Sequence, residues 1–142
     1  MTRASARSFA LALAVVIGQV RAADTVVVIG HNNVPRLDAN TVDRVFTNRM
    51  IAVNGVFVTA VNFSRGDPVR SRFLRAFLNQ SDDQYTAYML SRKSVGLGKP
   101  PQEFHVSADV IGFVNSTPGA IGYIAEADVR PGMNVISKAA SR

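Results

Sequence analysis

A short polar turn between two apolar stretches carries the residues best suited to hold an anion. It consists of Ser64, Arg65 and Gly66, and Asp67 and Arg70 follow at the start of the next segment. Arginine donates charge-assisted, often bidentate hydrogen bonds to oxyanions, and a serine hydroxyl adds another donor. The pattern predicts a site in which these side chains act with the backbone N–H groups of the helix start. The predicted ligand-binding residues are Ser64, Arg65, Gly66, Asp67, Val69 and Arg70.

The same residues also fit a purely structural role. Asp67 is a good helix N-cap, because its carboxylate can accept from the free N–H groups of the first turn. Arg70, Arg72 and Arg75 would mostly cover the solvent side of that helix and pair with Asp67 and its neighbours. The Asp67 charge would also repel a bound oxyanion, by about 4 kcal/mol at ~4 Å and an effective dielectric of about 20. Both interpretations remain open.

The turn joins a predicted buried strand to a predicted amphipathic helix. Val56–Phe63 is almost continuously apolar, which is typical of a central strand in a parallel sheet. Pro68 suits the first helical position, where its missing N–H costs nothing. A strand that delivers its carboxyl end to a helix N-terminus is where α/β proteins bind anions. The buried helix face would be Phe73, Leu74, Phe77 and Leu78.

Two further apolar runs, Thr25–Gly30 and Ala120–Ala125, predict central strands. Asp38 would cap a short helix that ends near Phe46. Thr25–Gly30, this helix and Val56–Phe63 together have the size of a βαβ unit, whose crossover should be right-handed. We therefore expect an α/β domain with a mixed, mostly parallel sheet and helices on both faces.

The second half of the chain predicts two more helices and an edge strand. Ser81 and Gln84 match a capping box, and Asp82 and Asp83 complement the dipole of the helix they begin. Ser94–Phe104 is rich in Gly and Pro, which indicates a loop without regular structure.

Beyond that loop, Ser107 would cap a helix that Pro118 and Gly119 end. Met133–Ser137 predicts the last edge strand.

The first 22 residues have the composition of an export signal. Arg3 and Arg7 precede an apolar stretch, Phe9–Gly18, that is too short to span a bilayer. Small residues then favour cleavage after Ala22, so we expect a periplasmic or secreted protein with one domain, residues 23–142. An uncleaved interfacial anchor is the alternative.

Composition argues against several classes of function. Residues 23–142 contain 13 Lys and Arg and 10 Asp and Glu, so their net charge is +3 against +6 for the whole chain. The chain has no run of basic residues with interleaved aromatics, so we expect no nucleic-acid binding. The absence of cysteine excludes disulfides and thiolate zinc sites. His31 and His105 lack ligand-spaced carboxylates, and no GxSxG elbow is present, so we expect no metal, no cofactor and no enzymatic activity.

Several segments together resemble one lobe of the phosphate-binding proteins of ABC transporters, the PstS-like periplasmic solute-binding proteins. They are VVVIGHNNVPRLDANTVDRVF, VNFSRGDPVRSRF, the Gly-Lys-Pro-Pro loop and VIGFVNSTPGAIGYI, within Val26–Ile124. More narrowly, the chain resembles small exported proteins that carry only this lobe. It implies a type II binding-protein topology and a ligand such as inorganic phosphate or another oxyanion. It also implies an ABC permease, a sensor protein or a second copy as partner.

The chain departs from the family pattern in two respects. Family members bind their ligand in a cleft that closes between two lobes, whereas this chain has enough residues for a single lobe. Anchored on Phe73, the family has an arginine where this chain has Phe63, and Ser-Gly-Thr where it has Asp67, Pro68 and Val69. Two functions stay open: solute binding for ABC-type uptake or sensing, and a non-enzymatic interaction module that keeps the fold without a ligand.

Overall fold

The computed structural model describes residue 14 and residues 25–139 of the chain. Apart from residue 14, the predicted export signal and its cleavage site after Ala22 lie outside the described residues. No helix in the described part of the chain is long and apolar enough to cross a membrane.

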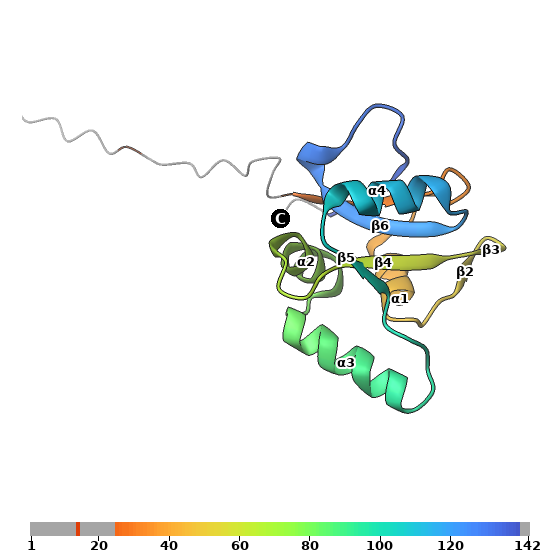
Figure 1. Cartoon of the computed structure of the whole chain (residues 1–142), viewed down its shortest axis with the longest axis vertical. Helices are drawn as coiled ribbons and strands as arrows, with labels where there is room; N and C mark the ends of the chain where they lie inside the picture. The colour runs from red at the N-terminus through yellow and green to blue at the C-terminus, as the bar shows by residue number, and fades with distance from the viewer. Residues whose placement is uncertain (1–13, 15–24, 140–142) are drawn as a thin grey trace, which may run out of the picture.

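The described residues alternate between short strands and helices (Figure 1). The strands are β1 (Val26–Gly30), β2 (Ala52–Val53), β3 (Val56–Phe57), β4 (Thr59–Phe63), β5 (Gln102–Phe104), β6 (Ala120–Ala125) and β7 (Val135–Lys138). The helical segments are α1 (Ala39–Phe46), α2 (Pro68–Phe73), the π-helix η2 (Leu74–Leu78), α3 (Asp82–Ser94), α4 (Ser107–Ser116) and the 3-10 turn η3 (Glu126–Asp128).

Five strands form the central sheet in the order β5-β4-β6-β1-β7. β4 runs parallel to both β5 and β6, whereas β1 runs antiparallel to both β6 and β7. Four of these five strands therefore point the same way, and β1 opposes them. This arrangement confirms the predicted α/β class with a mixed, mostly parallel sheet.

The predicted βαβ crossover from Thr25–Gly30 to Val56–Phe63 is wrong. β1 lies between β6 and β7, and β6 separates it from β4. Because β1 also runs against the direction of β4, the connection through α1 does not join parallel neighbours. Strand and helix lengths do not encode pairing partners, and the partners of β1 come from much later in the chain.

Val56–Phe63 is also not one strand, as the sequence predicted. Asn54 and Gly55 have φ of 47° and 78°, so they form a tight two-residue turn that folds β3 back onto β2. Val56–Phe57 therefore belongs to this hairpin, and Phe57 is 77% exposed. The central strand β4 begins only at Thr59.

Helices cover both faces of β6 (Figure 1). Successive side chains of a strand point to opposite faces of its sheet. Gly122 faces α4, where a Cβ atom at this position would lie 2.8 Å from Val110 Cγ1. Tyr123 points to the opposite face, where its ring stacks on Phe73 of α2 at 3.9 Å. The expected helices on both faces are confirmed.

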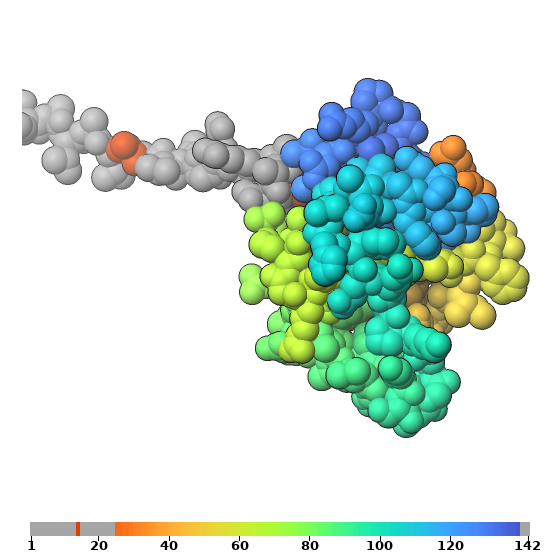
Figure 2. All heavy atoms as spheres, viewed as in Figure 1, coloured from red at the N-terminus to blue at the C-terminus, as the bar shows by residue number. Residues whose placement is uncertain are grey.

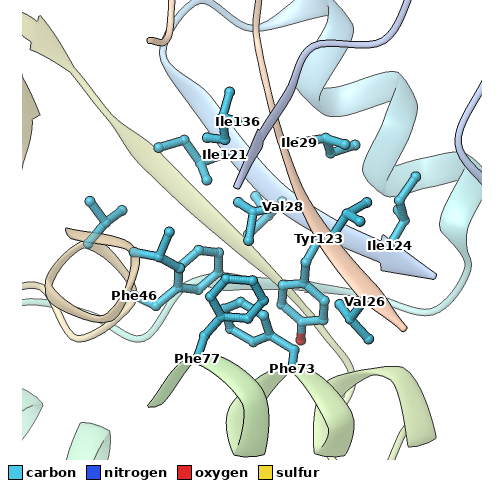
Figure 3. Close-up of a cluster of buried hydrophobic side chains, with 14 of the residues drawn as sticks. Val26, Val28, Ile29, Phe46, Phe73, Phe77, Ile121, Tyr123, Ile124 and Ile136 are labelled. Carbon is cyan, nitrogen blue, oxygen red and sulfur yellow. The ribbon is translucent and has the colours of Figure 1, made fainter. Parts of the chain in front are cut away.

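Aromatic rings fill the core between the sheet and the helices α1 and α2 (Figure 3). Phe73 is fully buried, and its ring centroid lies 4.6 Å from that of Phe46 and 5.3 Å from that of Phe77. Aromatic pairs of this kind contribute about 0.5–1.5 kcal/mol beyond the area they bury. The predicted apolar face of the central helix is therefore the centre of the core. All four predicted residues are buried: Phe73, Leu74, Phe77 and Leu78.

The predicted helix starts are mostly confirmed. Asp38 accepts from Thr41 N at 2.7 Å, and this hydrogen bond lowers the pKa of the Asp38 carboxyl. Ser81 forms the predicted capping box. The prediction for Ser107 is wrong, because Val106 is the N-cap of α4 and the Ser107 hydroxyl instead donates to Asp128.

The two sheet edges are formed by short strands. β7, Val135–Lys138, corresponds to the predicted edge strand Met133–Ser137. The prediction that Ser94–Phe104 lacks regular structure is wrong at its end, since β5, Gln102–Phe104, pairs with β4. Proximity to a formed strand, rather than local composition, accounts for this pairing.

Candidate anion-binding turn

Backbone hydrogen bonds to the neighbouring strand position the turn after β4. Ser64 N donates to Phe104 O at 2.9 Å, and Asp67 N donates to Ser64 O at 3.0 Å. Gly66 has φ of +84°, a left-handed conformation that favours glycine. The chain reverses here and starts α2 with Pro68 in its first turn, as predicted.

Asp67 is the N-cap of α2. Its Oδ1 accepts from Val69 N at 2.8 Å. One of the backbone donors expected to face an anion is therefore already bonded to a carboxylate of the chain itself.

A second carboxylate, that of Asp82 at the start of α3, lies against the turn. Asp82 Oδ2 accepts from Gly66 N at 2.7 Å, and its Oδ1 accepts from Arg70 Nε at 2.9 Å. The Asp82 side chain is 14% exposed and that of Arg70 is 3% exposed. A carboxylate bonded to a backbone N–H and a guanidinium makes the contacts that a bound oxyanion would make.

The remaining terminal nitrogens of Arg70 also have partners. Nη1 donates to Glu103 Oε1 at 2.7 Å and to Phe63 O at 3.0 Å, and Nη2 donates to Thr86 Oγ1 at 3.1 Å. The expectation that Arg70 covers the solvent side of its helix is therefore wrong. A buried charge requires compensation of this kind, because an unpaired one would be strongly destabilising.

Arg65 and Ser64 are occupied as well, although they lie nearer to solvent. Arg65 Nη2 donates to Asp83 Oδ1 at 2.8 Å, and this bond raises the pKa of the Arg65 guanidinium. The Ser64 hydroxyl lies 2.7 Å from His105 Nδ1 and 3.2 Å from Phe104 O. Both pairs are exposed enough for salt and water to compete with them.

Carboxylates outnumber arginines in this set of contacts. The two arginines and four carboxylates give a formal charge of +2 − 4 = −2, which disfavours a further anion. They are Arg65, Arg70, Asp67, Asp82, Asp83 and Glu103.

The structure brings the predicted residues Ser64–Arg70 together and adds three acidic residues that the sequence analysis did not place there. Asp82 and Asp83 were interpreted only as complements of their own helix dipole. A pair of acids opening the helix that follows two nearby arginines is the signal that could have indicated the contact. Glu103 gave no comparable signal, because its strand was predicted as loop.

A chain of buried polar groups lies behind the turn. Tyr123 donates its hydroxyl proton to Asn62 Oδ1, and Asn62 Nδ2 donates to Tyr85 Oη at 3.2 Å. Tyr85 in turn donates to Phe46 O at 2.8 Å, and Phe63 N donates to Tyr123 Oη at 3.1 Å. Burial raises the pKa of both tyrosines, since it penalises the phenolate form. These bonds fix the end of β4, and thus the turn, relative to β6 and α3.

Among residue 14 and residues 25–139, no three His, Asp or Glu side chains are arranged to hold a metal ion.

Comparison with known proteins gives matches in structure alone. No protein-family model matches the chain, and no curated protein matches its sequence. One similar structure is that of a protein assigned as a phosphate ABC transporter substrate-binding protein from Clostridium perfringens, with phosphate bound. It has 18% sequence identity and a TM-score of 0.62, over 79% of this chain and 44% of that one.

Another similar structure is an ABC-type phosphate transport receptor from Vibrio cholerae. It has 13% identity and a TM-score of 0.61, over 79% of this chain and 45% of that one. The chain thus has an α/β fold shared with part of these transport proteins and spans less than half the length of each.

Proposed function

We propose that this chain is an exported, non-enzymatic interaction module that keeps the fold of a solute-binding protein without a ligand and acts through contacts with another protein. One observation carries the proposal. The Asp82 carboxylate occupies the Gly66 N–H and the Arg70 guanidinium, which are the donors best placed to hold an oxyanion. The fold keeps the strand-turn-helix of a ligand site while its own acids occupy the donors.

Phosphate and the Asp82 carboxylate would compete for the same Arg70 guanidinium. A free phosphate would have to displace Asp82, and the displaced carboxylate would remain tethered nearby with its charge. A tethered group competes at an effective concentration in the millimolar range or above, which free phosphate at micromolar levels cannot match. We therefore expect the turn to stay closed to phosphate.

Isothermal titration calorimetry of residues 23–142 with phosphate, sulfate and arsenate tests this proposal. The expected result is no saturable heat at ligand concentrations up to about the millimolar range. The mass of the protein in solution should be measured in the same buffer, because a second copy is one of the proposed partners. Saturable binding of phosphate in the micromolar range would overturn the proposal.

Oxyanion binding at Ser64–Arg70 is the second candidate, and the similarity to a structure with bound phosphate favours it. In that case the Asp67→Ser substitution, which keeps a capping oxygen and removes one charge, should strengthen phosphate binding at least tenfold. The proposal of a closed turn instead predicts that Asp67→Ser leaves the titration flat, because Asp82 still bonds Gly66 and Arg70. A titration of the Asp67→Ser variant with phosphate therefore distinguishes the two candidate functions.

Export is part of the proposal and has its own test. Cleavage after Ala22 would give a mature chain that begins at Ala23. N-terminal sequencing of the protein from the periplasmic or secreted fraction should find this residue first. Intact Met1 on protein from a cytoplasmic fraction would contradict the proposed export.

A further inference from the structure

Two hollows on the surface share a pair of prolines. One hollow, of about 140 Å³, lies between Pro100, Pro101 and the α3 residues Met89 and Leu90. The other, of about 220 Å³, lies between the same prolines and residues that include Ile51 and Val58, beside the β2–β3 hairpin. We call this continuous region the diproline surface, and it comprises Ile51, Val58, Met89, Leu90, Pro100 and Pro101.

Large apolar side chains are exposed at and next to the diproline surface. Ile51 is 66% exposed and Leu90 is 53% exposed, and each lines one of the two hollows. Val95 and Leu97, which follow Leu90 in the chain, are 69% and 51% exposed. Figure 2 shows the segment after α3, in blue-green, and the hairpin, in yellow, on the outside of the molecule. Contiguous exposed apolar groups of this kind mark interaction surfaces in soluble domains.

The two chain segments that contribute Ile51, Pro100 and Pro101 to the diproline surface are basic. Within residues 43–51 and 92–103 there are five basic and two acidic residues, a net charge of +3. Residues 23–142 as a whole also carry 13 − 10 = +3, so the rest of this range sums to zero. Two backbone and side-chain bonds connect the two segments, from Asn48 Nδ2 to Lys99 O at 2.7 Å and from Arg92 Nη2 to Asn48 O at 3.3 Å.

Most of this positive charge is not neutralised locally. Arg44, Lys93 and Lys99 are exposed and make no ion pair with any described residue. Arg49 pairs with Asp43 at 2.8 Å. Unpaired charges of one sign beside exposed apolar side chains favour a partner of the opposite sign that also carries apolar side chains.

We infer that the diproline surface is the docking site for an acidic segment of a partner protein, which inserts an apolar side chain into the hollow between the two prolines and α3. This inference rests on the proposed function, since it specifies the chemistry of the protein contact. The rigid proline pair separates the hollows, and each has a volume that suits a single side chain rather than an extended surface. The basic residues of the two chain segments would pair with the acidic residues of the partner segment and set its orientation.

Peptide binding to residues 23–142 tests the inference. The probe is a fluorescein-labelled peptide in which acidic residues alternate with other residues, two of which are leucines. One control peptide replaces its acidic residues by lysine, and the other replaces its leucines by serine. By fluorescence anisotropy, the acidic leucine peptide should bind at least tenfold more tightly than either control. Its affinity should fall between about 50 and 500 mM salt, since exposed charges are screened.

Matched protein variants locate the binding. Lys99→Glu and Leu90→Ser should each weaken binding of the acidic leucine peptide at least tenfold. Arg130→Glu makes the same charge change at an exposed site outside the two segments, and Val106→Ser removes another exposed apolar side chain, so both should bind as the wild type does. Circular dichroism of every variant verifies that it is folded.

Three outcomes would overturn the inference. Equal binding of the acidic and basic peptides, or no binding of either, would show that the surface does not recognise an acidic partner. Binding to vesicles of anionic lipid that Leu90→Ser and Lys99→Glu abolish would make the surface a membrane contact. A dimer in solution that Leu90→Ser dissociates would make the occupant a second copy. Phosphate calorimetry is separate, because a positive titration would overturn the closed turn and leave the peptide result standing.

Discussion

Arg70 and Asp82 form a buried ion pair that joins the central helix to α3. Arg70 Nε and Asp82 Oδ1 lie 2.9 Å apart, and the second oxygen of the same carboxylate bonds the backbone of Gly66. A single side chain therefore neutralises a buried guanidinium and terminates a turn.

Asp82→Ala should lower the free energy of unfolding by about 3 kcal/mol, because it leaves a buried charge short of a partner. We expect the lower end of the usual range, since Glu103 still bonds Arg70. Urea denaturation of residues 23–142, followed by circular dichroism, measures the change. Asp83→Ala is the control and should have a far smaller effect, because Asp83 pairs with Arg65 at the exposed surface. Equal effects of the two variants would contradict the structural importance of the buried pair.

Phe73→Ala should lower the free energy of unfolding by about 3–5 kcal/mol, from lost burial and the cavity left behind. Phe73 is fully buried and its ring lies parallel to that of Tyr123 at 3.9 Å. Leu97→Ala is a suitable control, since Leu97 is 51% exposed. A cost below about 1 kcal/mol for Phe73→Ala would mean that the face of the central helix is not core.

Gly122→Ala should destabilise the protein by about 1–3 kcal/mol through overpacking. Its new methyl group would lie 2.8 Å from Val110 Cγ1 and 3.1 Å from Val61 Cγ2. Gly112→Ala offers a matched comparison in α4, where a Cβ would meet nothing within 4 Å. That substitution should stabilise the helix by about 0.5–1 kcal/mol, since alanine has the higher helix propensity. Thermal unfolding of both variants should shift in opposite directions.

Alkaline pH should unfold the domain through its buried tyrosines. Burial raises the pKa of Tyr85 and Tyr123 above the ordinary value of 10.0. The stability from burying their neutral phenols is therefore fully present below the unfolded pKa of about 10. It is lost as pH rises past this value toward the folded pKa. The absorbance of their phenolates at about 295 nm should appear together with the loss of circular dichroism signal.

Tyr85→Phe provides the check on that titration. The variant should lose part of the absorbance change that coincides with unfolding, and a titration in denaturant should show ionisation near pH 10. Phenolate absorbance from Tyr85 or Tyr123 well before any loss of secondary structure would contradict the prediction.

The sequence predicted local features well and pairing poorly. Asp38, Asp67 and Ser81 cap helices as expected, because a cap depends on a side chain and the first few N–H groups after it. The direction and neighbours of β1 depend on β6 and β7, far along the chain, so periodicity near Thr25–Gly30 holds no information about them. Val56–Phe63 failed as one strand because two positive-φ residues before it set up a hairpin.

For the candidate turn, too, local features could be predicted from the sequence and contacts with distant elements could not. Its backbone course and the Asp67 cap follow from residues adjacent in sequence, and both were predicted. The burial of Arg70 was not, because its partners Asp82 and Glu103 belong to other elements. Residue types indicated anion chemistry, but the anion that the arginine binds is part of the same chain.

The position of β1 in the sheet has a consequence for the order in which the protein can assemble as it is made. β1 is the first of the described strands to leave the ribosome, yet Gly30 pairs with Ile121 and Val28 with Ser137. Both edges of β1 therefore stay open until nearly all of the chain has been synthesised. Such long-range pairing slows folding relative to synthesis. The central sheet can therefore be completed only after nearly the whole chain has been made.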